Sequence, residues 1–340
     1  SFLFPLPNPT NGDRVGFAGI YNSSSGGLIS ITGNTIGNST ANNITSVHRF
    51  GNVVGIHNTV SLFAVNISNN TIQNITVSAA NTGVDEQASI VGILDIPIAG
   101  AAATTIAQNT ITALSNTAAS GAIQVRGIFC KGGASNISTV DKNKISALNI
   151  ASSTNTSSIA GLTMKNVNQV NAYNNFISLG SGLSNDLVIN GIEHVNGAGY
   201  VYFNSVRILG TASGSANTYA FHYNTSSTFL SIKNTILYNE RTGGSGKHYA
   251  IRMQGSSSPA YTAAQGTNNL LYTTAAPLAN YAGLDCATLA LWNANCGGGD
   301  PVTASKTATV VFTSATDLHT ADFNVRNAGI SLSPTVVDDI

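Results

Sequence analysis

One segment decides the fold: Val65-Asn-Ile-Ser-Asn-Asn70-Thr-Ile72, whose pattern of apolar-x-apolar-x-x-Asn-x-apolar recurs along the chain. The copy before it is Ile29-Ser-Ile-Thr-Gly-Asn34-Thr-Ile36. Apolar and polar residues alternate within each copy, and this period of two is typical of a β-strand with one buried face. The asparagines at the same position of all eight copies are Asn34, Asn70, Asn109, Asn143, Asn175, Asn204, Asn234 and Asn269.

A second element lies upstream of each copy and ends in a small residue followed by a large apolar one. Successive copies of this pair are 29 to 37 residues apart, a period typical of stacked structural repeats. An apolar residue often stands three positions earlier, as Val53 does before Ile56. Because residues three apart cannot both face inward along a regular strand, we expect a bend at the small residue. The pairs are Gly19-Ile20, Gly55-Ile56, Gly92-Ile93, Gly127-Ile128, Gly161-Leu162, Gly191-Ile192, Ala220-Phe221 and Ala250-Ile251.

Repeats of this kind predict an all-β fold, a right-handed parallel β-helix of about eight three-strand coils with a divergent C-terminal capping coil. The links between strands are rich in Ser, Gly and Asn and show no helical periodicity, which argues against crossover helices. We expect a lead-in segment at 1–14, coils over 15–272 and the capping coil over 273–340, since an uncapped sheet edge invites aggregation. The recurring asparagines are predicted to turn the chain in the left-handed region and to stack as an internal ladder of amides.

Charge is scarce and balanced, with 14 Lys and Arg against 14 Asp and Glu. A neutral chain lacks the basic stripe that neutralises phosphates, which argues against nucleic acid and against an anionic membrane surface. No apolar run approaches the about 20 residues that cross a bilayer, so we expect no membrane insertion in this segment. The apolar start is short and rich in proline, unlike a signal peptide, and the chain is interpreted as part of a larger protein.

Three cysteines place few constraints on the cellular compartment. Cys130 lies alone in an apolar run and is expected to be buried as a small hydrophobic residue. Cys286 and Cys296 lie close together in a Gly-rich stretch. They form either a disulfide, which would indicate an oxidising compartment, or two free thiols, and the spacing leaves both alternatives open.

One polar column follows the phase of the repeat, at the residue after the large apolar one. Glu193, His222 and Arg252 occupy this position in successive coils and are predicted to lie side by side. Such a trio could perform acid–base chemistry, but a solvated face with complementary charges is the more ordinary interpretation. The other carboxylates are scattered over different coils, whereas sugar cleavage needs groups that face one bond. The histidines share no ligand spacing, so we expect no metal and no cofactor.

Tyrosine is concentrated in the C-terminal half of the chain. Strand parity predicts that Tyr173, Tyr200 and Tyr202 point outward from neighbouring coils. An outward aromatic patch can stack on the apolar faces of sugar rings, and this is the hypothesis for a ligand site. The alternative is that the rings pack across strands and merely support the sheet.

The coil pattern looks like that of right-handed parallel β-helix repeats in secreted bacterial proteins. The ending resembles the closing coil of large surface β-helix proteins exported by bacterial type IX secretion, although it departs from that pattern at 320–326. This resemblance implies contact with the type IX secretion machinery and, beyond Ile340, an Asp-Gly stretch and a sorting domain. It rests on Leu289-Ala-Leu-Trp292, Phe312-Thr-Ser-Ala-Thr-Asp317-Leu-His319, Asn327-Ala-Gly329 and Asp338-Asp339-Ile340.

The sequence therefore predicts an extracellular structural or adhesive β-helix module of a larger bacterial surface protein, secreted or held at the cell surface and without catalysis. A glycan or another surface protein is the expected partner. The alternative is a carbohydrate-active enzyme, a polysaccharide lyase or glycosidase, that works on one face of the β-helix. Release of reducing ends from a polysaccharide would distinguish the two.

Overall fold

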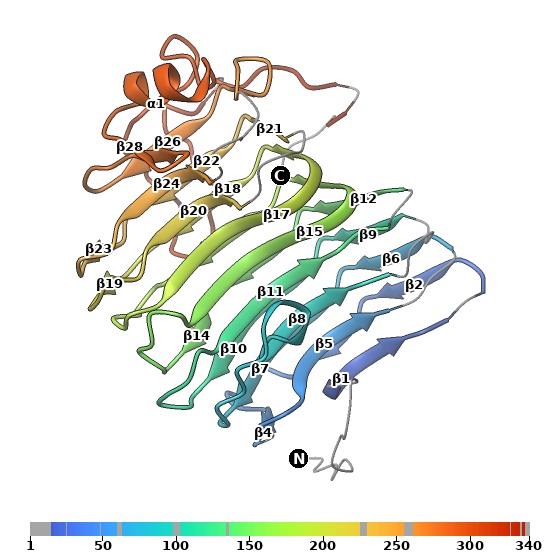
Figure 1. The fold of residues 1–340 in the computed structure, drawn as a ribbon. Helices are drawn as coiled ribbons and strands as arrows, with labels where there is room; N and C mark the ends of the chain where they lie inside the picture. The colour runs from blue at the N-terminus through green and yellow to red at the C-terminus, as the bar shows by residue number, and fades with distance from the viewer. Residues whose placement is uncertain are drawn as a thin grey trace.

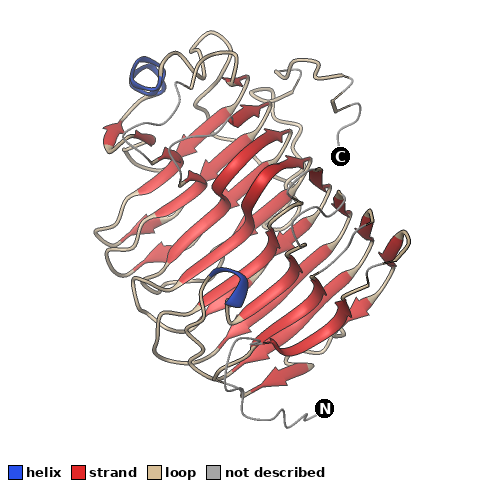
Figure 2. Ribbon diagram, turned by 45° about the vertical axis from the view of Figure 1, so that its right-hand side comes forward, coloured by secondary structure: helices blue, strands red, loops and turns tan. Residues whose placement is uncertain are grey.

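The computed structural model is a parallel β-helix whose coils stack along one axis, as Figure 1 and Figure 2 show. Each strand of a coil pairs in parallel with its counterpart in the next coil, which confirms the predicted fold class. The residues that the structure describes are 15–24, 26–47, 49–59, 63–97, 103–133, 136–224, 230–254, 261–326, 328–333, 335 and 336.

Each coil contributes up to three strands, and the eight coils span about seven full turns. The first strands are β1 (Val15–Asn22), β5 (Asn52–Asn58), β8 (Ile90–Asp95), β11 (Gln124–Cys130), β15 (Ser158–Tyr173), β17 (Val188–Tyr202), β20 (Thr218–Tyr223) and β24 (His248–Met253). The long strands β15 and β17 also form the second side of their coils, where the remaining strands are β2 (Ile29–Thr32), β6 (Val65–Ser68), β9 (Thr104–Ala107), β12 (Ile137–Asp141), β21 (Leu230–Lys233) and β25 (Gly266–Thr267).

The third side of the coils forms a separate sheet. Its strands are β3 (Thr35–Ile36), β7 (Thr71–Val77), β10 (Thr110–Asn116), β13 (Lys144–Ser146), β16 (Phe176–Leu179), β18 (Ser205–Ile208), β22 (Ile236–Asn239) and β26 (Leu270–Thr273), with β4 (Ile44–Ser46) and β14 (Leu148–Ile150) beside them. A small separate pair is formed by β19 (Thr211–Ala212) and β23 (Thr242–Gly243).

The core is built from columns of Ile, Val and Leu that stack from coil to coil. Val53 pairs with Ile90 and Ile56 pairs with Ile93, and all four side chains are fully buried in one core. Both apolar residues of the upstream element therefore face inward although they are three apart. Since burial of such a side chain contributes roughly 1.5–3 kcal/mol, each added coil stabilises its neighbours.

Lack of space, rather than a turn, requires the glycine of the upstream element. The φ angle of Gly127 lies outside the left-handed region. A Cβ added to Gly127 would lie 2.6 Å from the carbonyl oxygen of Gly161 in the next coil and 2.6 Å from Cγ2 of Ile145 in its own coil. The β-branched residue across the core fills the volume that a methyl group would need.

Coils seven and eight carry alanine at this position, and the residue across the core changes with it. Ala220 and Ala250 are fully buried. The third strands of these coils bring Leu237 and Leu271 to the position that is Ile or Val in the earlier coils. Leucine branches at Cγ and not at Cβ, so it has no counterpart of the β-branched methyl groups, such as Cγ2 of Ile145 and Cγ1 of Val206, that an added Cβ would meet in the earlier coils. The two positions thus change together, as Gly with Ile or Val and as Ala with Leu.

The asparagine column forms a ladder of amides. Oδ1 of Asn143 accepts hydrogen bonds from the backbone N of Asn109 at 3.0 Å and from its Nδ2 at 2.9 Å. Nδ2 of Asn143 donates to the carbonyl oxygen of Ile106 at 2.9 Å and to Oδ1 of Asn175 at 3.0 Å. The same side-chain bond links successive members of the series Asn34, Asn70, Asn109, Asn143, Asn175 and Asn204.

The predicted left-handed turn lies one residue earlier than the ladder asparagines. Asn69, Gln108 and Asn174 have φ angles of 57°, 57° and 53°, and each directly precedes a ladder residue. The ladder side chain points inward, where its amide can bond backbone groups of two coils. The prediction was therefore right about the ladder and wrong about which residue adopts the left-handed conformation.

In coil seven the ladder position holds Thr235, and the assignment of Asn234 to the ladder is wrong. The backbone N of Thr235 donates to Oδ1 of Asn269 at 2.9 Å, and its hydroxyl donates to the carbonyl oxygen of Val201 at 3.1 Å. Asn234 has a φ angle of 53°, so it occupies the left-handed position of this coil. The register of coil seven is shifted by one residue from the predicted one.

A short helix closes the C-terminal end of the coils. After β27 (Ala279–Tyr281) the strand β28 (Leu284–Cys286) pairs antiparallel to it, which ends the parallel series of the first strands. The helix α1 (Leu289–Cys296) then places Trp292, which is fully buried, against the end of the core. Nε1 of Trp292 donates to Asp300 at 3.0 Å, and the same carboxylate accepts from Nδ2 of Asn269 at 2.7 Å. The cap thereby completes the hydrogen bonds of the last ladder residue.

The three cysteines are free and buried. Of the two alternatives for Cys286 and Cys296, the structure has the free thiols and not the disulfide. Nδ2 of Asn295 donates to Sγ of Cys286 at 3.3 Å, and burial raises the pKa of the Cys296 thiol to about 12. Burial also raises the pKa of the Cys286 thiol, so both thiols are protonated near neutral pH and serve as packing residues of the cap. Cys130 is buried in the core, as predicted.

A second buried polar column ends in a carboxyl group. Nδ2 of Asn22 donates to Asn58, and Nδ2 of Asn58 donates to Oδ1 of Asp95, each at 2.6 Å. Cys130 donates to the other oxygen of Asp95 at 3.4 Å. Burial raises the pKa of Asp95 from 3.8 to about 6, although these hydrogen bonds oppose the shift.

Replacing Asp95 by asparagine is expected to stabilise the protein above about pH 6. Between pH 3.8 and about 6 the folded state holds a proton on Asp95 that the unfolded state has lost. The wild type therefore loses stability from this group as pH rises through that window, by up to about 1.4 kcal/mol for each pH unit. Urea denaturation of both proteins across this range should show a difference that grows up to about pH 6 and is constant above it. A difference that does not change with pH would contradict this titration.

Candidate functional site

The predicted tyrosine group stacks side by side but is not an exposed platform. The rings of Tyr173 and Tyr202 have centroids 5.7 Å apart, and those of Tyr200 and Tyr202 are 5.3 Å apart. Tyr173 is only 8% exposed and Tyr202 only 6%. The hydroxyl of Tyr202 donates to Oγ of Ser231 at 3.0 Å, and burial raises its pKa. The hypothesis of an exposed sugar platform is therefore wrong for Tyr173 and Tyr202, and packing across strands describes them better.

Glu193, His222 and Arg252 lie side by side, as predicted, because β17, β20 and β24 pair in register at these residues. The structure gives each of them a partner outside the trio. Oε2 of Glu193 accepts from Nη1 of Arg126 at 2.7 Å, and Nη1 of Arg252 donates to the hydroxyl of Tyr219 at 2.8 Å. The side chains are neighbours, but the bonds of Oε2 of Glu193, Nε2 of His222 and Nη1 of Arg252 run to residues outside the trio, and Nδ1 of His222 is buried without a hydrogen-bond partner.

His222 is unsuited to donate a proton near neutral pH. Its Nε2 lies 3.3 Å from Oε1 of Gln254, and its ring stacks on Tyr219 with centroids 4.4 Å apart. Burial lowers the pKa of His222 to about 4, in spite of the neighbouring charge of Glu193. The imidazole is therefore neutral at pH 7, so it could accept a proton from a substrate but could not supply one.

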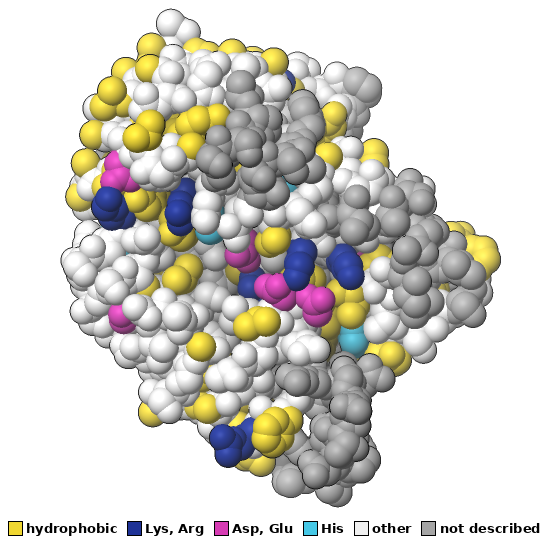
Figure 3. All heavy atoms as spheres, viewed as in Figure 1, with side chains coloured by type: hydrophobic (Ala, Val, Ile, Leu, Met, Phe, Trp, Pro, Cys, Tyr) yellow, Lys and Arg dark blue, Asp and Glu magenta, His cyan; other side chains and the backbone are white. Residues whose placement is uncertain are grey.

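The sequence reasoning missed a charged group centred on Arg126, whose side chain is only 3% exposed. Besides Glu193, Arg126 binds Asp85 at 3.3 Å, and Nζ of Lys165 binds Asp85 at 2.6 Å and Glu86 at 3.5 Å. Figure 3, viewed as Figure 1, shows Lys, Arg, Asp and Glu side chains gathered in the middle of the face toward the viewer. We call these five residues the charged band.

The charged band holds a loop against the outer face of the first-strand sheet. Asp85 belongs to the 3-10 helix η1 (Asp85–Gln87), which Figure 2 shows in front of the strands. Beneath it lies a small cluster of buried apolar residues that includes Val91 and Phe129. The sequence held one sign of this ion-pair group, because Arg126 occupies a position where the neighbouring coils have the apolar residues Val91 and Ala160. A cation at such a position indicates an ion pair, but the repeat does not show which acid is its partner.

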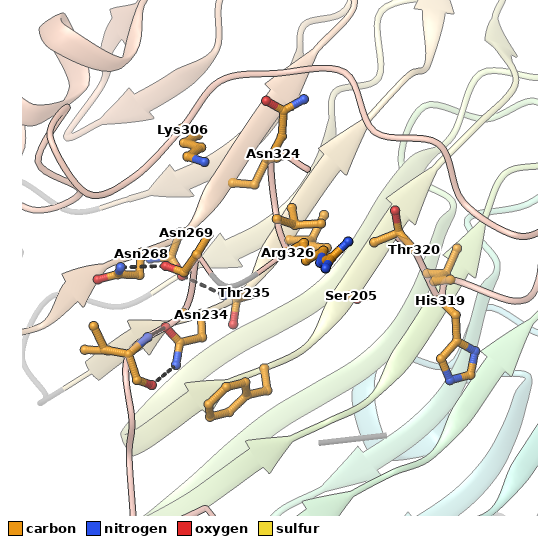
Figure 4. A pocket seen from close by; sticks show the side chains of 18 of the residues that line it. Ser205, Asn234, Thr235, Asn268, Asn269, Lys306, His319, Thr320, Asn324 and Arg326 are labelled. Atoms are coloured by element: carbon orange, nitrogen blue, oxygen red, sulfur yellow. Dashed lines mark hydrogen bonds between the residues drawn. The ribbon is translucent and has the colours of Figure 1, made fainter. Parts of the chain in front are cut away.

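A cleft of about 840 Å³ lies beside the third strands of the later coils, under the C-terminal segment 313–336 (Figure 4). Asn234 tethers this segment at Ile330. Nδ2 of Asn234 donates to the carbonyl oxygen of Ile330 at 2.7 Å, and Oδ1 of Asn234 accepts from the backbone N of Ile330 at 2.9 Å. Nδ2 of Asn268 donates to the carbonyl oxygen of Ala328 at 2.7 Å. The left-handed positions of coils seven and eight thus hold the roof of the cleft.

Two basic side chains, Lys306 and Arg326, and the imidazole of His319 line this cleft, and within the part of the chain that the structure describes no Asp or Glu joins them. His319 is bonded to Asp317 outside the lining. The cleft was not predicted, because it forms between strands of coils five to eight and a segment that follows the last coil.

The comparisons with known proteins leave the site to be interpreted from its residues. No protein-family model, curated protein or solved structure matches this chain. Among the described residues, no three or more His, Cys, Asp or Glu side chains are grouped so that they could hold a metal ion. No helix in the same part of the chain has the length and apolar character to cross a membrane.

Proposed function

We propose that the chain is a non-catalytic structural or adhesive module of a larger extracellular bacterial protein. The main support for this proposal is the way in which Glu193 and His222, two members of the trio, are held. Glu193 is held by Arg126 and by the hydroxyl of Thr163 at 3.3 Å, and His222 has a pKa of about 4. Sugar cleavage requires an acid and a base or nucleophile that face one bond, whereas Glu193 is bound to Arg126 and Thr163 and the neutral His222 cannot act as the acid.

A location at the cell surface and export by type IX secretion are parts of the same proposal. They are supported by the similarity of the closing coil, including Trp292 and Phe312, to the closing coils of such exported proteins. Trp292 closes the core, and Phe312 packs edge-on against Tyr238 with ring centroids 5.4 Å apart. The stacked coils would give such a protein a stiff spacer, and a surface with few charges suits contact with glycans or with other surface proteins.

Incubation with a panel of polysaccharides is expected to give binding without release of reducing ends or of unsaturated products. The triple variant Glu193→Gln, His222→Gln, Arg252→Gln keeps polar side chains at the three positions and is expected to behave like the parent. Lys247→Gln, a change at an exposed residue, is the matched control. Turnover by the parent that disappears in a triple variant still folded by circular dichroism would reject the non-catalytic role and favour the carbohydrate-active enzyme.

A further inference from the structure

We propose that the cleft under the C-terminal segment binds an acidic oligosaccharide, one that carries carboxylate or sulfate groups. The inference rests on the proposed adhesive role and names the class of ligand for one surface. Three observations support the inference: the basic side chains of the cleft, the polar and apolar residues that line the rest of it, and the hydrogen bonds that hold the segment above it.

Two basic side chains of the cleft are exposed and have no acidic partner. Within the described residues, neither Lys306 nor Arg326 makes an ion pair with Asp or Glu. Arg207, by contrast, binds Glu240 at 2.6 Å. Because the lining holds Lys306 and Arg326 and none of its described residues is Asp or Glu, basic side chains exceed acidic ones in the cleft itself. A carboxylate or sulfate group is the natural partner of such a pair.

The neutral part of the lining suits a sugar. Thr320, Asn324 and Ser331 bring hydroxyl and amide groups, and Ile236 and Leu270 bring apolar surface. Sugar rings carry hydroxyl groups at their edges and apolar CH groups on their faces, so both kinds of lining have a counterpart. The volume of about 840 Å³ lies in the range of small-molecule sites, about 300–1,000 Å³.

The walls of the cleft are fixed by the protein's own hydrogen bonds. Asn234 and Asn268 hold the backbone at Ile330 and Ala328, as described above. Nδ2 of Asn324 donates to the carbonyl oxygen of Thr309 at 3.3 Å, which orients its amide in the wall. A site whose walls are held in advance loses less conformational entropy when a ligand binds.

Binding is tested by titration calorimetry of the whole chain with three oligosaccharides of equal length: an oligogalacturonate, a sulfated oligogalactan and a neutral oligogalactan. We expect binding of at least one acidic probe, weaker binding at higher salt, and no binding of the neutral probe. The variant Lys306→Ala, Arg326→Ala is expected to bind about tenfold or more weakly, since two charge-assisted contacts are lost. Lys306→Arg, Arg326→Lys keeps the charges and should retain binding, and Lys247→Ala is the matched control.

The probe that binds identifies the acidic group as carboxylate or sulfate. Equal affinity of the double alanine variant and the parent would overturn the inference, and so would preference for the neutral probe or binding of none of the three. These results would leave the non-catalytic role standing, because that role is tested by turnover and by the variants of Glu193, His222 and Arg252.

Discussion

Replacing Asn143 by leucine is expected to lower the free energy of unfolding by roughly 3 kcal/mol or more. The leucine side chain would leave the backbone N and Nδ2 of Asn109 without their acceptor and the carbonyl oxygen of Ile106 without its donor. Each buried polar group that loses its partner costs about 1–3 kcal/mol, and all three lie inside the stack. Urea denaturation followed by far-ultraviolet circular dichroism measures the change.

Two variants control this prediction. Asn143→Thr should be milder than Asn143→Leu, because the hydroxyl of Thr235 bonds the corresponding carbonyl oxygen in coil seven. Asn149→Leu changes an exposed residue of the same coil and should alter stability by less than about 0.5 kcal/mol. Equal stability of Asn143→Leu and the wild type would show that the amide ladder contributes nothing to the fold.

Gly127→Ala is expected to destabilise the protein by roughly 3 kcal/mol, at the upper end of the usual cost of overpacking a core. The added methyl group would meet the carbonyl oxygen of Gly161 and Cγ2 of Ile145, each at 2.6 Å. Neither atom belongs to the mobile end of a side chain, so the strands themselves must shift. Thermal and urea denaturation should both report the loss.

The double variant Gly127→Ala, Ile145→Leu should recover part of that loss, because it recreates the pair found in coils seven and eight. Ile145→Leu alone should be destabilising, so the two changes are expected to couple favourably in a double-mutant cycle. Gly26→Ala is the control, since a Cβ there would meet no atom within 4 Å. Additive effects of the two substitutions would show that Ile145 is not what excludes the methyl group.

The fold could be predicted because the same period recurs in many coils. The predicted register was wrong at coil seven, where Ile236 and Leu237 are both apolar and Asn234 and Thr235 are both polar. Two registers one residue apart satisfy this local pattern equally well. The structure buries Leu237 in the main core and places Ile236 at the edge of a smaller cluster under the C-terminal segment. Only that long-range packing distinguishes the two registers.

The candidate sites were less predictable, because exposure and charge pairing depend on segments outside the repeat. Strand parity placed Tyr173 and Tyr202 correctly as neighbours but could not tell that they are nearly buried. Asp85 lies 41 residues before Arg126, in a loop whose path no periodicity describes. The ion pair between Asp85 and Arg126 could therefore be found only in the structure, whereas the alignment of Glu193 with His222 followed from the repeat alone.

The match between glycine and its β-branched neighbour has a consequence for how such a rod can evolve. Gly127 and Ile145 belong to the same coil, as do Ala220 and Leu237, so duplication or deletion of a whole coil keeps each matched pair together. Recombination inside a coil would instead join a glycine to a leucine or an alanine to an isoleucine, which leaves a void or a clash. The length of the rod is thus free to change in steps of one coil, while the interior of each coil is inherited as a unit.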